Sequence, residues 1–282
     1  MPNNTSNFCP ELKVHEGHLD FLRECFKKPP AQGKVGSRPD RYLRELNKIR
    51  GTAHSFPGSI SSRAKLDRAA VQRVARDPKI DPLVAYAAAM AWGGRNFSNY
   101  RYSLESKSGE NLIKILSVLR VSNSNRQQDF KRTQKACDSI KGLGISFYTK
   151  LLYFFRPASD AYILDQWTAK SAILLFPDCP IKLTYSGMPS PVTKPEDFAW
   201  FCRALECLGE RIHDGKTWSG EEVEQAVFDR PKGKWREYVR AHFPDGKKAK
   251  KATQRDARVT RDLGETPIPD ARKNRLGAKI VT

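Results

Sequence analysis

Apolar residues recur at three- and four-residue intervals through most of this chain, and strict alternation of apolar and polar residues is scarce. The first spacing places side chains on one face of a helix, whereas alternation would place them on one face of a strand. The pattern therefore predicts an all-α fold. The expected helices cover residues 63–76, 82–92, 110–120, 126–140, 145–155, 166–175, 196–212 and 219–229.

The chain is long enough to bury a large core, because it has 282 residues of which 39% are hydrophobic. We expect three parts. Residues 1–60 are predicted to form an N-terminal helical segment that packs on the body, and residues 61–245 the helical body itself. Residues 246–282 contain few large apolar side chains and many basic ones, which predicts a disordered basic tail.

The formal net charge of +19 points to a polyanionic partner, and nucleic acid is the first candidate. The alternative is a basic surface that serves only solubility. Residues 246–282 hold eleven Lys and Arg against four Asp and Glu, a balance of +7 that leaves +12 on residues 1–245. The folded body itself is therefore expected to present a basic face.

The compartment is predicted from two absences. The first residues lack the apolar core of a signal peptide, and no stretch approaches eighteen consecutive apolar residues, so we expect a soluble, cytoplasmic protein without a membrane partner. The six cysteines form no paired framework, which favours reduced thiols. Cys179, Cys202 and Cys207 are wrongly spaced for an iron–sulfur cluster, so no cluster and no side-chain metal site are expected.

The most informative segment begins with a Gly-Leu-Gly turn at residues 142–144 between two predicted helices. Two glycines permit a tight turn that leaves backbone amides uncovered at a helix N-terminus, where they suit a DNA phosphate. The alternative is an ordinary glycine-rich connection between helices. The candidate DNA-backbone contacts are Gly142, Leu143, Gly144 and Ser146.

Asp165 follows Gly142 by 23 residues, after an apolar helix, a short turn and an apolar run, and it opens the next predicted helix. A carboxylate there can stabilise positive charge that develops on a sugar when an N-glycosidic bond breaks. The alternative is a helix N-cap without a chemical role.

Over residues 141–172 the sequence resembles the helix-hairpin-helix DNA glycosylase superfamily, and more closely its prokaryotic 8-oxoguanine-glycosylase-like branch. The resemblance implies a cleft between helical subdomains, a hairpin at about residues 138–150, and Asp165 as the catalytic acid. It also implies a monomer that binds double-stranded DNA containing a modified base in the prokaryotic nucleoid. A monovalent cation on the hairpin carbonyls is the one possible cofactor.

The chain departs from the family pattern at Ser146, where bifunctional relatives have a nucleophilic lysine. Lys150 lies one helical turn later on the same face and could replace that amine, because burial would lower its pKa. The alternatives are a lysine that extends to solvent and one that binds a phosphate. If water attacks instead, the enzyme is monofunctional and leaves a plain abasic site.

Seven residues are candidates for the pocket that receives an everted base. Glu224 and Phe228 have the spacing of an element that lines this pocket in 8-oxoguanine enzymes. For the aromatic candidates the alternative is ordinary core packing. The set comprises Trp92, Phe147, Gln166, Trp167, Glu224, Gln225 and Phe228.

Two substrates remain open: 8-oxoguanine, removed in base excision repair, and a hypermodified phage base such as glucosylated hydroxymethylcytosine, removed in antiviral defence. The phage-base alternative rests on analogy with relatives of this branch that act in antiviral defence. The rival functions are a non-catalytic helix-hairpin-helix DNA-binding protein and a nuclease, and no cluster of carboxylates suited to a nuclease metal site is evident in the sequence.

Overall fold

The computed structural model describes residues 12–30, 36–58, 60, 64–93, 97–212 and 217–243. Within these ranges the chain forms helices and one isolated β-bridge, between Leu183 and Pro189, so the predicted all-α fold is confirmed. The helices are α1 (Glu16–Cys25), α2 (Pro39–Arg50), α3 (Arg68–Arg76), α4 (Pro82–Gly93), α5 (Phe97–Leu104), α6 (Ser106–Arg120), α7 (Arg126–Cys137), α8 (Ile145–Phe155), α9 (Gln166–Leu175), α10 (Pro195–Arg211), α11 (Gly220–Phe228) and α12 (Lys234–His242).

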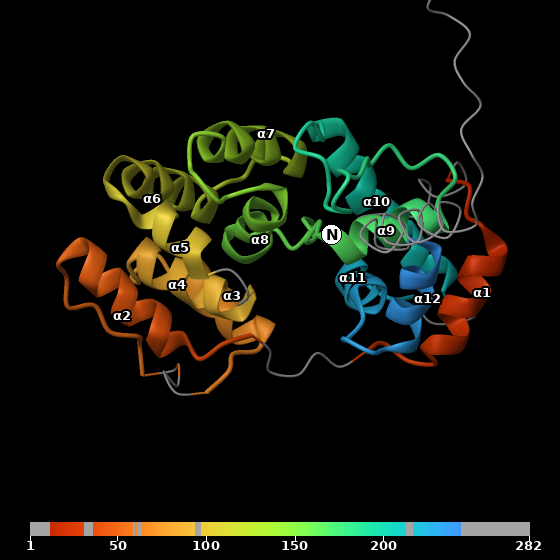
Figure 1. Cartoon of the computed structure of the whole chain (residues 1–282), viewed down its shortest axis with the longest axis horizontal. Coiled ribbons are helices and arrows are strands. Elements are labelled where there is room, and N and C mark those ends of the chain that lie inside the picture. The colour runs from red at the N-terminus through yellow and green to blue at the C-terminus, as the bar shows by residue number, and fades with distance from the viewer. Residues whose placement is uncertain are drawn as a thin grey trace, which may run out of the picture. The chain divides into compact units, whose positions relative to one another are not determined.

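Helix α8 lies beside α7 and α4 (Figure 1), and it contacts α3, α4, α6 and α7. Helix α9 belongs to a second group, since it packs against α1, α11 and α12. Helix α10 connects the two groups, because it contacts both α7 and α11. The segment between α8 and α9 therefore passes from one group of helices to the other.

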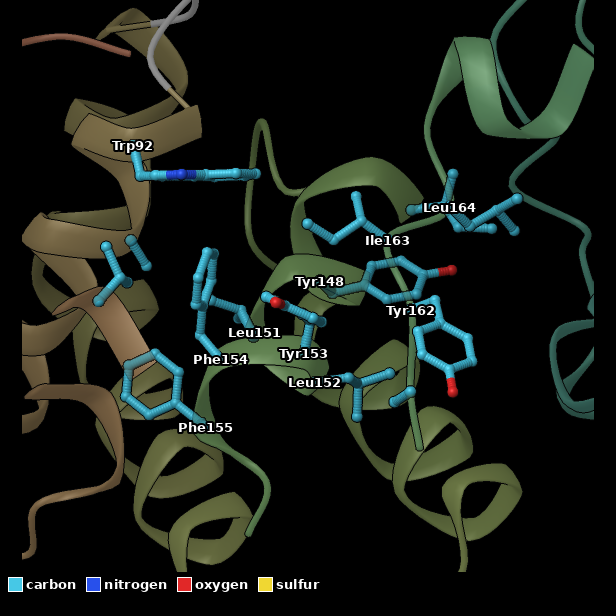
Figure 2. Close-up of a cluster of buried hydrophobic side chains, with 14 of the residues drawn as sticks. Trp92, Tyr148, Leu151, Leu152, Tyr153, Phe154, Phe155, Tyr162, Ile163 and Leu164 are labelled. Carbon is cyan, nitrogen blue, oxygen red and sulfur yellow. The ribbon is translucent and has the colours of Figure 1, made fainter. Parts of the chain in front are cut away.

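The sequence of α8 explains why its neighbours cover it so fully. Nine of its eleven residues are buried in contacts with the surrounding helices, and the other two, Phe147 and Lys150, are partly buried. Figure 2 shows the aromatic part of this core, where Phe154 meets the ring of Trp92 edge to face at 5.1 Å between centroids. A helix that is apolar on nearly every face needs this degree of cover.

Some helix boundaries differ from the prediction, with local causes. Helix α3 begins at Arg68 rather than at residue 63, because the side chain of Asp67 accepts a hydrogen bond from the Ala70 amide and caps the helix there. Helix α7 ends at Cys137, three residues early, where the chain enters the glycine turn. Helices α5 and α12 are not predicted, and α2 is expected only as part of the N-terminal helical segment, because short helices are stabilised mainly by tertiary packing.

Among the described residues no helix is both long enough and apolar enough to cross a membrane. Cys25, Cys137, Cys179 and Cys202 are free thiols, whereas Cys207 is disulfide-bonded, so the prediction of reduced thiols is wrong at that position. The division into residues 1–60, 61–245 and 246–282 stays a prediction, and the basic tail lies outside the described residues.

Candidate active site

The glycine turn joins α7 to α8, and Gly142 is the residue that requires glycine. Its φ is +88°, in the left-handed region, and a Cβ atom there would lie 2.8 Å from Cγ of Asn99. Two backbone hydrogen bonds close the turn, from Ile140 to the carbonyl of Cys137 at 2.9 Å and from Leu143 to that of Ile140 at 3.2 Å. The turn therefore has a defined shape before any ligand binds.

Gly144 has a different role, because it is the N-cap of α8 and its Cα faces open space. No side chain caps α8, so side chains leave the amides of its first turn uncovered. The side chains of Leu143 and Ser146 are buried, and the hydroxyl of Ser146 has no hydrogen-bond partner among the described residues. Of the four predicted backbone contacts, Leu143 and Ser146 can thus offer DNA only their main-chain atoms.

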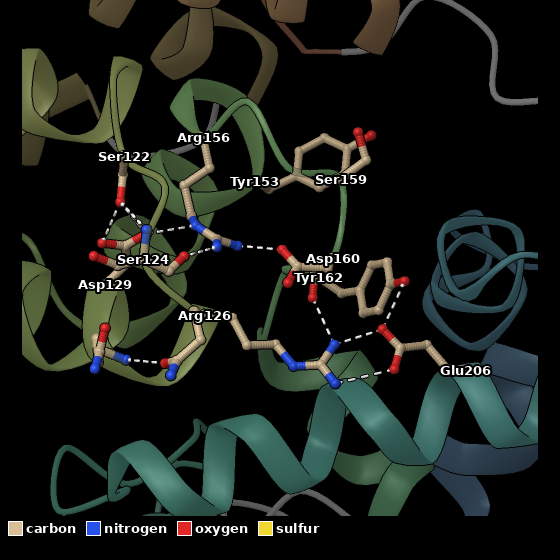
Figure 3. A network of polar contacts seen from close by, with 12 residues as sticks. Ser122, Ser124, Arg126, Asp129, Tyr153, Arg156, Ser159, Asp160, Tyr162 and Glu206 are labelled. Carbon is tan, nitrogen blue, oxygen red and sulfur yellow. Dashed lines mark hydrogen bonds and ion pairs between the residues drawn. The ribbon is translucent and has the colours of Figure 1, made fainter. Parts of the chain in front are cut away.

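A buried polar network holds the turn that follows α8 (Figure 3). The guanidinium of Arg156 donates from Nε to Oδ2 of Asp129 at 2.7 Å and from one terminal nitrogen to the carbonyl of Ser124 at 2.9 Å. It also forms an ion pair with Asp160. Because Arg156 and Asp129 are both buried, this network fixes where the chain leaves α8.

Further bonds guide the chain from that turn to α9. Arg126 pairs with Glu206 and donates to the carbonyl of Asp160 at 2.7 Å. The amide of Leu164 donates to the hydroxyl of Thr149, on α8, at 3.2 Å. The residue after Leu164 is Asp165, so α8 and this network position the start of α9.

Asp165 is the N-cap of α9, so the cap that was the alternative to a catalytic role is present. Its Oδ1 accepts hydrogen bonds from the amides of Trp167 at 2.8 Å and Thr168 at 3.1 Å, and the Thr168 hydroxyl accepts one from the Asp165 amide at 2.9 Å. No hydrogen bond to Oδ2 is found among the described residues. The cap therefore orients the half-buried carboxylate and leaves one oxygen available.

Lys150 projects from α8 into the same region. Its Nζ lies 3.1 Å from the position of a Cβ atom on Gly93 and 5.1 Å from the centroid of the Phe147 ring. Burial lowers the pKa of Lys150 below its ordinary value; Asp165 and Glu224 act to raise it, and Arg68 acts to lower it further. The fold thus brings Lys150, Asp165 and Glu224 into one electrostatic cluster. In the described part of the chain the amine has no hydrogen bond or ion pair.

Arg68 and Glu224 complete the cluster, joining α3 to α11 through a buried ion pair. Burial raises the pKa of Glu224 even beside the guanidinium. Arg68 also lies over the rings of Trp92 and Tyr153, with Cζ 5.2 Å and 4.9 Å from their centroids. The Tyr153 hydroxyl donates to Oε1 of Glu221 at 2.5 Å.

Arg68, Tyr153 and Glu221 are not among the site residues that the sequence predicts. A signal for Arg68 was present, because it shares a helix face with Val71 and Ala75, both of which are buried. A charged residue on an apolar face implies a buried partner. Tyr153 offered no such signal, since an aromatic residue in an apolar helix is typical of a core.

Several polar atoms around this cluster are buried without a hydrogen-bond partner in the described residues. They are Nε of Arg68, Nε2 of Gln72, Nε1 of Trp92 and Oε1 of Glu224. Gln72 follows Arg68 by one turn of α3 and so lies on the same helix face. Buried donors and acceptors without partners destabilise the fold, so a group of them in one place indicates a functional site.

The remaining pocket candidates lie on α9 and α11, and Arg236 links two of them, because its Cζ is 4.4 Å from the ring centroid of Phe228 and also lies over the ring of Trp167. Trp167 is surrounded by cations, with Arg236, Lys170 and Arg240 at 4.7 Å, 5.2 Å and 5.5 Å from its ring centroid. Its neighbour Gln166 lies in the same first turn of α9.

Gln225 and Phe228 line a cavity of about 810 Å³ at the ends of α1 and α11. Lys27, Lys28 and Arg230 lie on its walls. Of the seven candidates, Trp92, Phe147 and Glu224 lie in the cluster around Lys150 and Arg68.

Within the described ranges, no three His, Cys, Asp or Glu side chains are arranged to hold a metal ion. Comparison with protein-family models gives a match over residues 28–228, to the family described as "Putative 8-oxoguanine DNA glycosylase OGG-like protein". Comparison with curated proteins and with solved structures gives no match. The matched range contains the glycine turn, Lys150, Asp165 and Glu224, and it covers more than half of the chain. The chain therefore belongs to this OGG-like DNA glycosylase family.

Proposed function

We propose that the protein everts a modified base from duplex DNA and cleaves its N-glycosidic bond, leaving an abasic site. One observation carries the proposal. Asp165, half-buried with one carboxylate oxygen available, lies near enough to Lys150 to act against the lowering of its pKa by burial. Family membership supplies DNA as the partner and base removal as the class of reaction.

Asp165 has the geometry for charge stabilisation. As the bond between C1′ and the base breaks, its electrons leave with the base and positive charge develops on the sugar. A carboxylate held by two backbone amides stabilises that charge without reorienting. Water then adds at C1′ and loses a proton, and the released base takes up a proton. This is the monofunctional reaction.

The surroundings of Lys150 favour a second route, in which its amine attacks C1′ in place of water. Only the neutral amine is a nucleophile, and burial increases the neutral fraction by lowering the pKa of Lys150. Attack would form a covalent bond between Nζ and C1′ as the base departs. Opening of the sugar ring would then give a Schiff base, which borohydride reduces to a stable adduct.

The unpartnered polar atoms supply candidate readers for the base. Oε1 of Glu224 accepts hydrogen bonds, whereas the nitrogens of Trp92 and Gln72 donate them. We propose that an everted base supplies the missing partners. Its identity is either 8-oxoguanine, as in base excision repair, or a hypermodified pyrimidine such as glucosylated hydroxymethylcytosine, as in antiviral defence.

We further propose that the uncovered amides at Gly144 and the first turn of α8 bind the DNA backbone. Carbonyls of the glycine turn would hold a monovalent cation there. The protein would act as a cytoplasmic monomer at the prokaryotic nucleoid.

The proposal is tested by incubating the protein with DNAs that carry modified bases, phage genomes included, and identifying released bases by mass spectrometry. Asp165→Asn keeps the helix cap and removes the charge, so excision should fall about a hundredfold or more with DNA binding retained.

The matched control is Asp81→Asn, because Oδ1 of Asp81 also accepts from the amides two and three residues later, at 2.7 Å and 3.3 Å. This variant should excise normally. If the unaltered protein binds DNA and releases no base from any substrate, it is a non-catalytic DNA-binding protein. Cleavage of unmodified DNA without alkali would instead indicate a nuclease.

A further inference from the structure

The cavity of about 810 Å³ lies between the end of α1 and the loop that joins α11 to α12. Helices α1 and α12 pack side by side there (Figure 1). The segment Cys25–Pro30 forms one wall, and the segment from Phe228 to Lys234 supplies most of the other. Small-molecule sites have volumes of roughly 300–1,000 Å³, so the cavity is large enough for a small organic ligand.

The loop wall has a fixed shape, because two of its residues adopt left-handed backbone conformations without being glycine. The φ angles are +42° for Asp229 and +66° for Lys232. The buried carboxylate of Asp229 accepts hydrogen bonds from the amides of Arg230 at 2.6 Å and Arg236 at 3.3 Å. A Cβ atom on Gly233 would collide with that carboxylate. Backbone strain of this kind is found most often at ligand and active sites.

Positive charge is concentrated on the walls of this cavity. Asp229 is the one acidic residue among the described residues that line it, and both of its oxygens already accept hydrogen bonds from amides. Within the described ranges, no ion pair neutralises the four basic side chains of the walls, all of which are exposed. They are Lys27, Lys28, Arg230 and Lys234. Cations gathered around a hollow favour an anion there.

The rest of the lining is largely apolar, so an inorganic anion would leave the apolar wall uncovered. Phe228 contributes to this wall together with the prolines at positions 29, 30 and 231. Cys25 adds a neutral thiol, because burial raises its pKa to about 11. A ligand that matches both features combines an anionic group with a flat apolar body. A nucleotide has this composition, with a phosphate for the cations and a base for the apolar wall.

The proposed excision chemistry does not use this cavity. Lys150, Asp165 and Glu224 do not line it, and the segment from Asp229 to Lys234 lies beyond the family match, which ends at residue 228. We propose that the cavity is a second ligand site, which binds a nucleotide through its phosphate group. That phosphate belongs either to a free nucleoside monophosphate or to the end of a DNA strand, and the experiment distinguishes these sources.

Isothermal titration calorimetry on the full chain tests the site, with thymidine 5′-monophosphate as the probe. We expect saturable binding, and at least about tenfold weaker binding of thymidine, which lacks the phosphate. The double variant Lys28→Gln/Arg230→Gln should weaken binding of the monophosphate about tenfold or more. Both side chains are exposed, so this variant should fold normally. The matched control is Lys114→Gln/Arg203→Gln, which removes the same charge from exposed positions on α6 and α10 and should bind normally.

Competition with a short single-stranded oligothymidylate identifies the source of the phosphate. If the oligonucleotide displaces the monophosphate and is equally sensitive to the double variant, the ligand is a DNA strand; if it displaces nothing, the ligand is a free nucleotide. Three results would overturn the site: no saturable binding of either probe, equal binding of thymidine and its monophosphate, and equal affinity of the double variant and the unaltered protein. The measurement involves no base excision, so its outcome is independent of the proposed function.

Discussion

Arg68 on α3 and Glu224 on α11 form an ion pair whose side chains are only 5% and 1% exposed. Buried pairs rarely add stability over apolar packing, since both charges must be removed from water. The position of this one, beside Lys150 and Trp92, favours a role in the site. It sets the electrostatic surroundings of the amine and links α11 to α3.

Breaking the pair should destabilise the fold. Glu224→Ala leaves the charge of Arg68 buried and uncompensated, so we expect the free energy of unfolding to fall by about 3–5 kcal/mol. The double variant Arg68→Met/Glu224→Leu removes both charges and should recover most of that loss. Urea denaturation measures both. A loss below about 1 kcal/mol in Glu224→Ala would show that water reaches the guanidinium.

Lys150 should be trapped on DNA if its amine attacks the sugar. Borohydride added during the reaction should then give a covalent protein–DNA adduct, visible by electrophoresis, that is absent in Lys150→Ala. The adduct should form faster as the pH rises toward the lowered pKa of Lys150, because the neutral amine fraction increases. Base release without any adduct would assign the attack to water.

The same lysine should reduce stability near neutral pH. Its pKa is lowered from 10.5 in the folded state, so between the folded and unfolded values the unfolded chain binds more protons, and stability rises with pH. Lys150→Met should therefore be more stable than the unaltered protein at pH 7, with a difference that shrinks as the pH approaches 10.5. Thermal unfolding at several pH values measures this difference. A constant difference would contradict the lowered pKa.

Arg156→Met should release the turn that leads to Asp165. Asp129 would lose its buried partner, and we expect a destabilisation of about 3–5 kcal/mol together with slower base excision. Arg132 provides a control, since it pairs with the same Asp129 from a side chain that is 52% exposed. Arg132→Met should change the free energy of unfolding by less than about 1 kcal/mol. Equal effects of the two variants would refute a special role for Arg156.

The two glycines of the turn should respond differently to alanine. Gly142→Ala forces a side chain into the left-handed region and against Asn99, so stability should fall by about 1 kcal/mol or more. Gly144 has a φ of −77° and open space, so Gly144→Ala should fold normally. Its added methyl group should still weaken DNA binding if a phosphate approaches the first turn of α8. Unchanged affinity would show that the DNA phosphate does not bind at the first turn of α8.

Much of this protein is determined by the sequence alone. The spacing of apolar residues predicts α8 and α9 with their observed boundaries, because helices of this kind carry their own periodicity. The glycine turn and Asp165 are recognisable for a similar reason. A left-handed backbone position requires one glycine and a helix cap requires one polar residue, so both are visible in the local sequence.

Only the tertiary structure decided which residues surround that aspartate. Arg68 and Glu224 are 156 residues apart in the chain, and no local pattern relates them. Tertiary packing also separates two of the predicted base-pocket residues. Glu224 and Gln225 are neighbours in sequence but face different surroundings on α11. A helix turns its side chains by about 100° per residue, so the packing of α11 sends one to the buried cluster and the other to the neighbouring cavity.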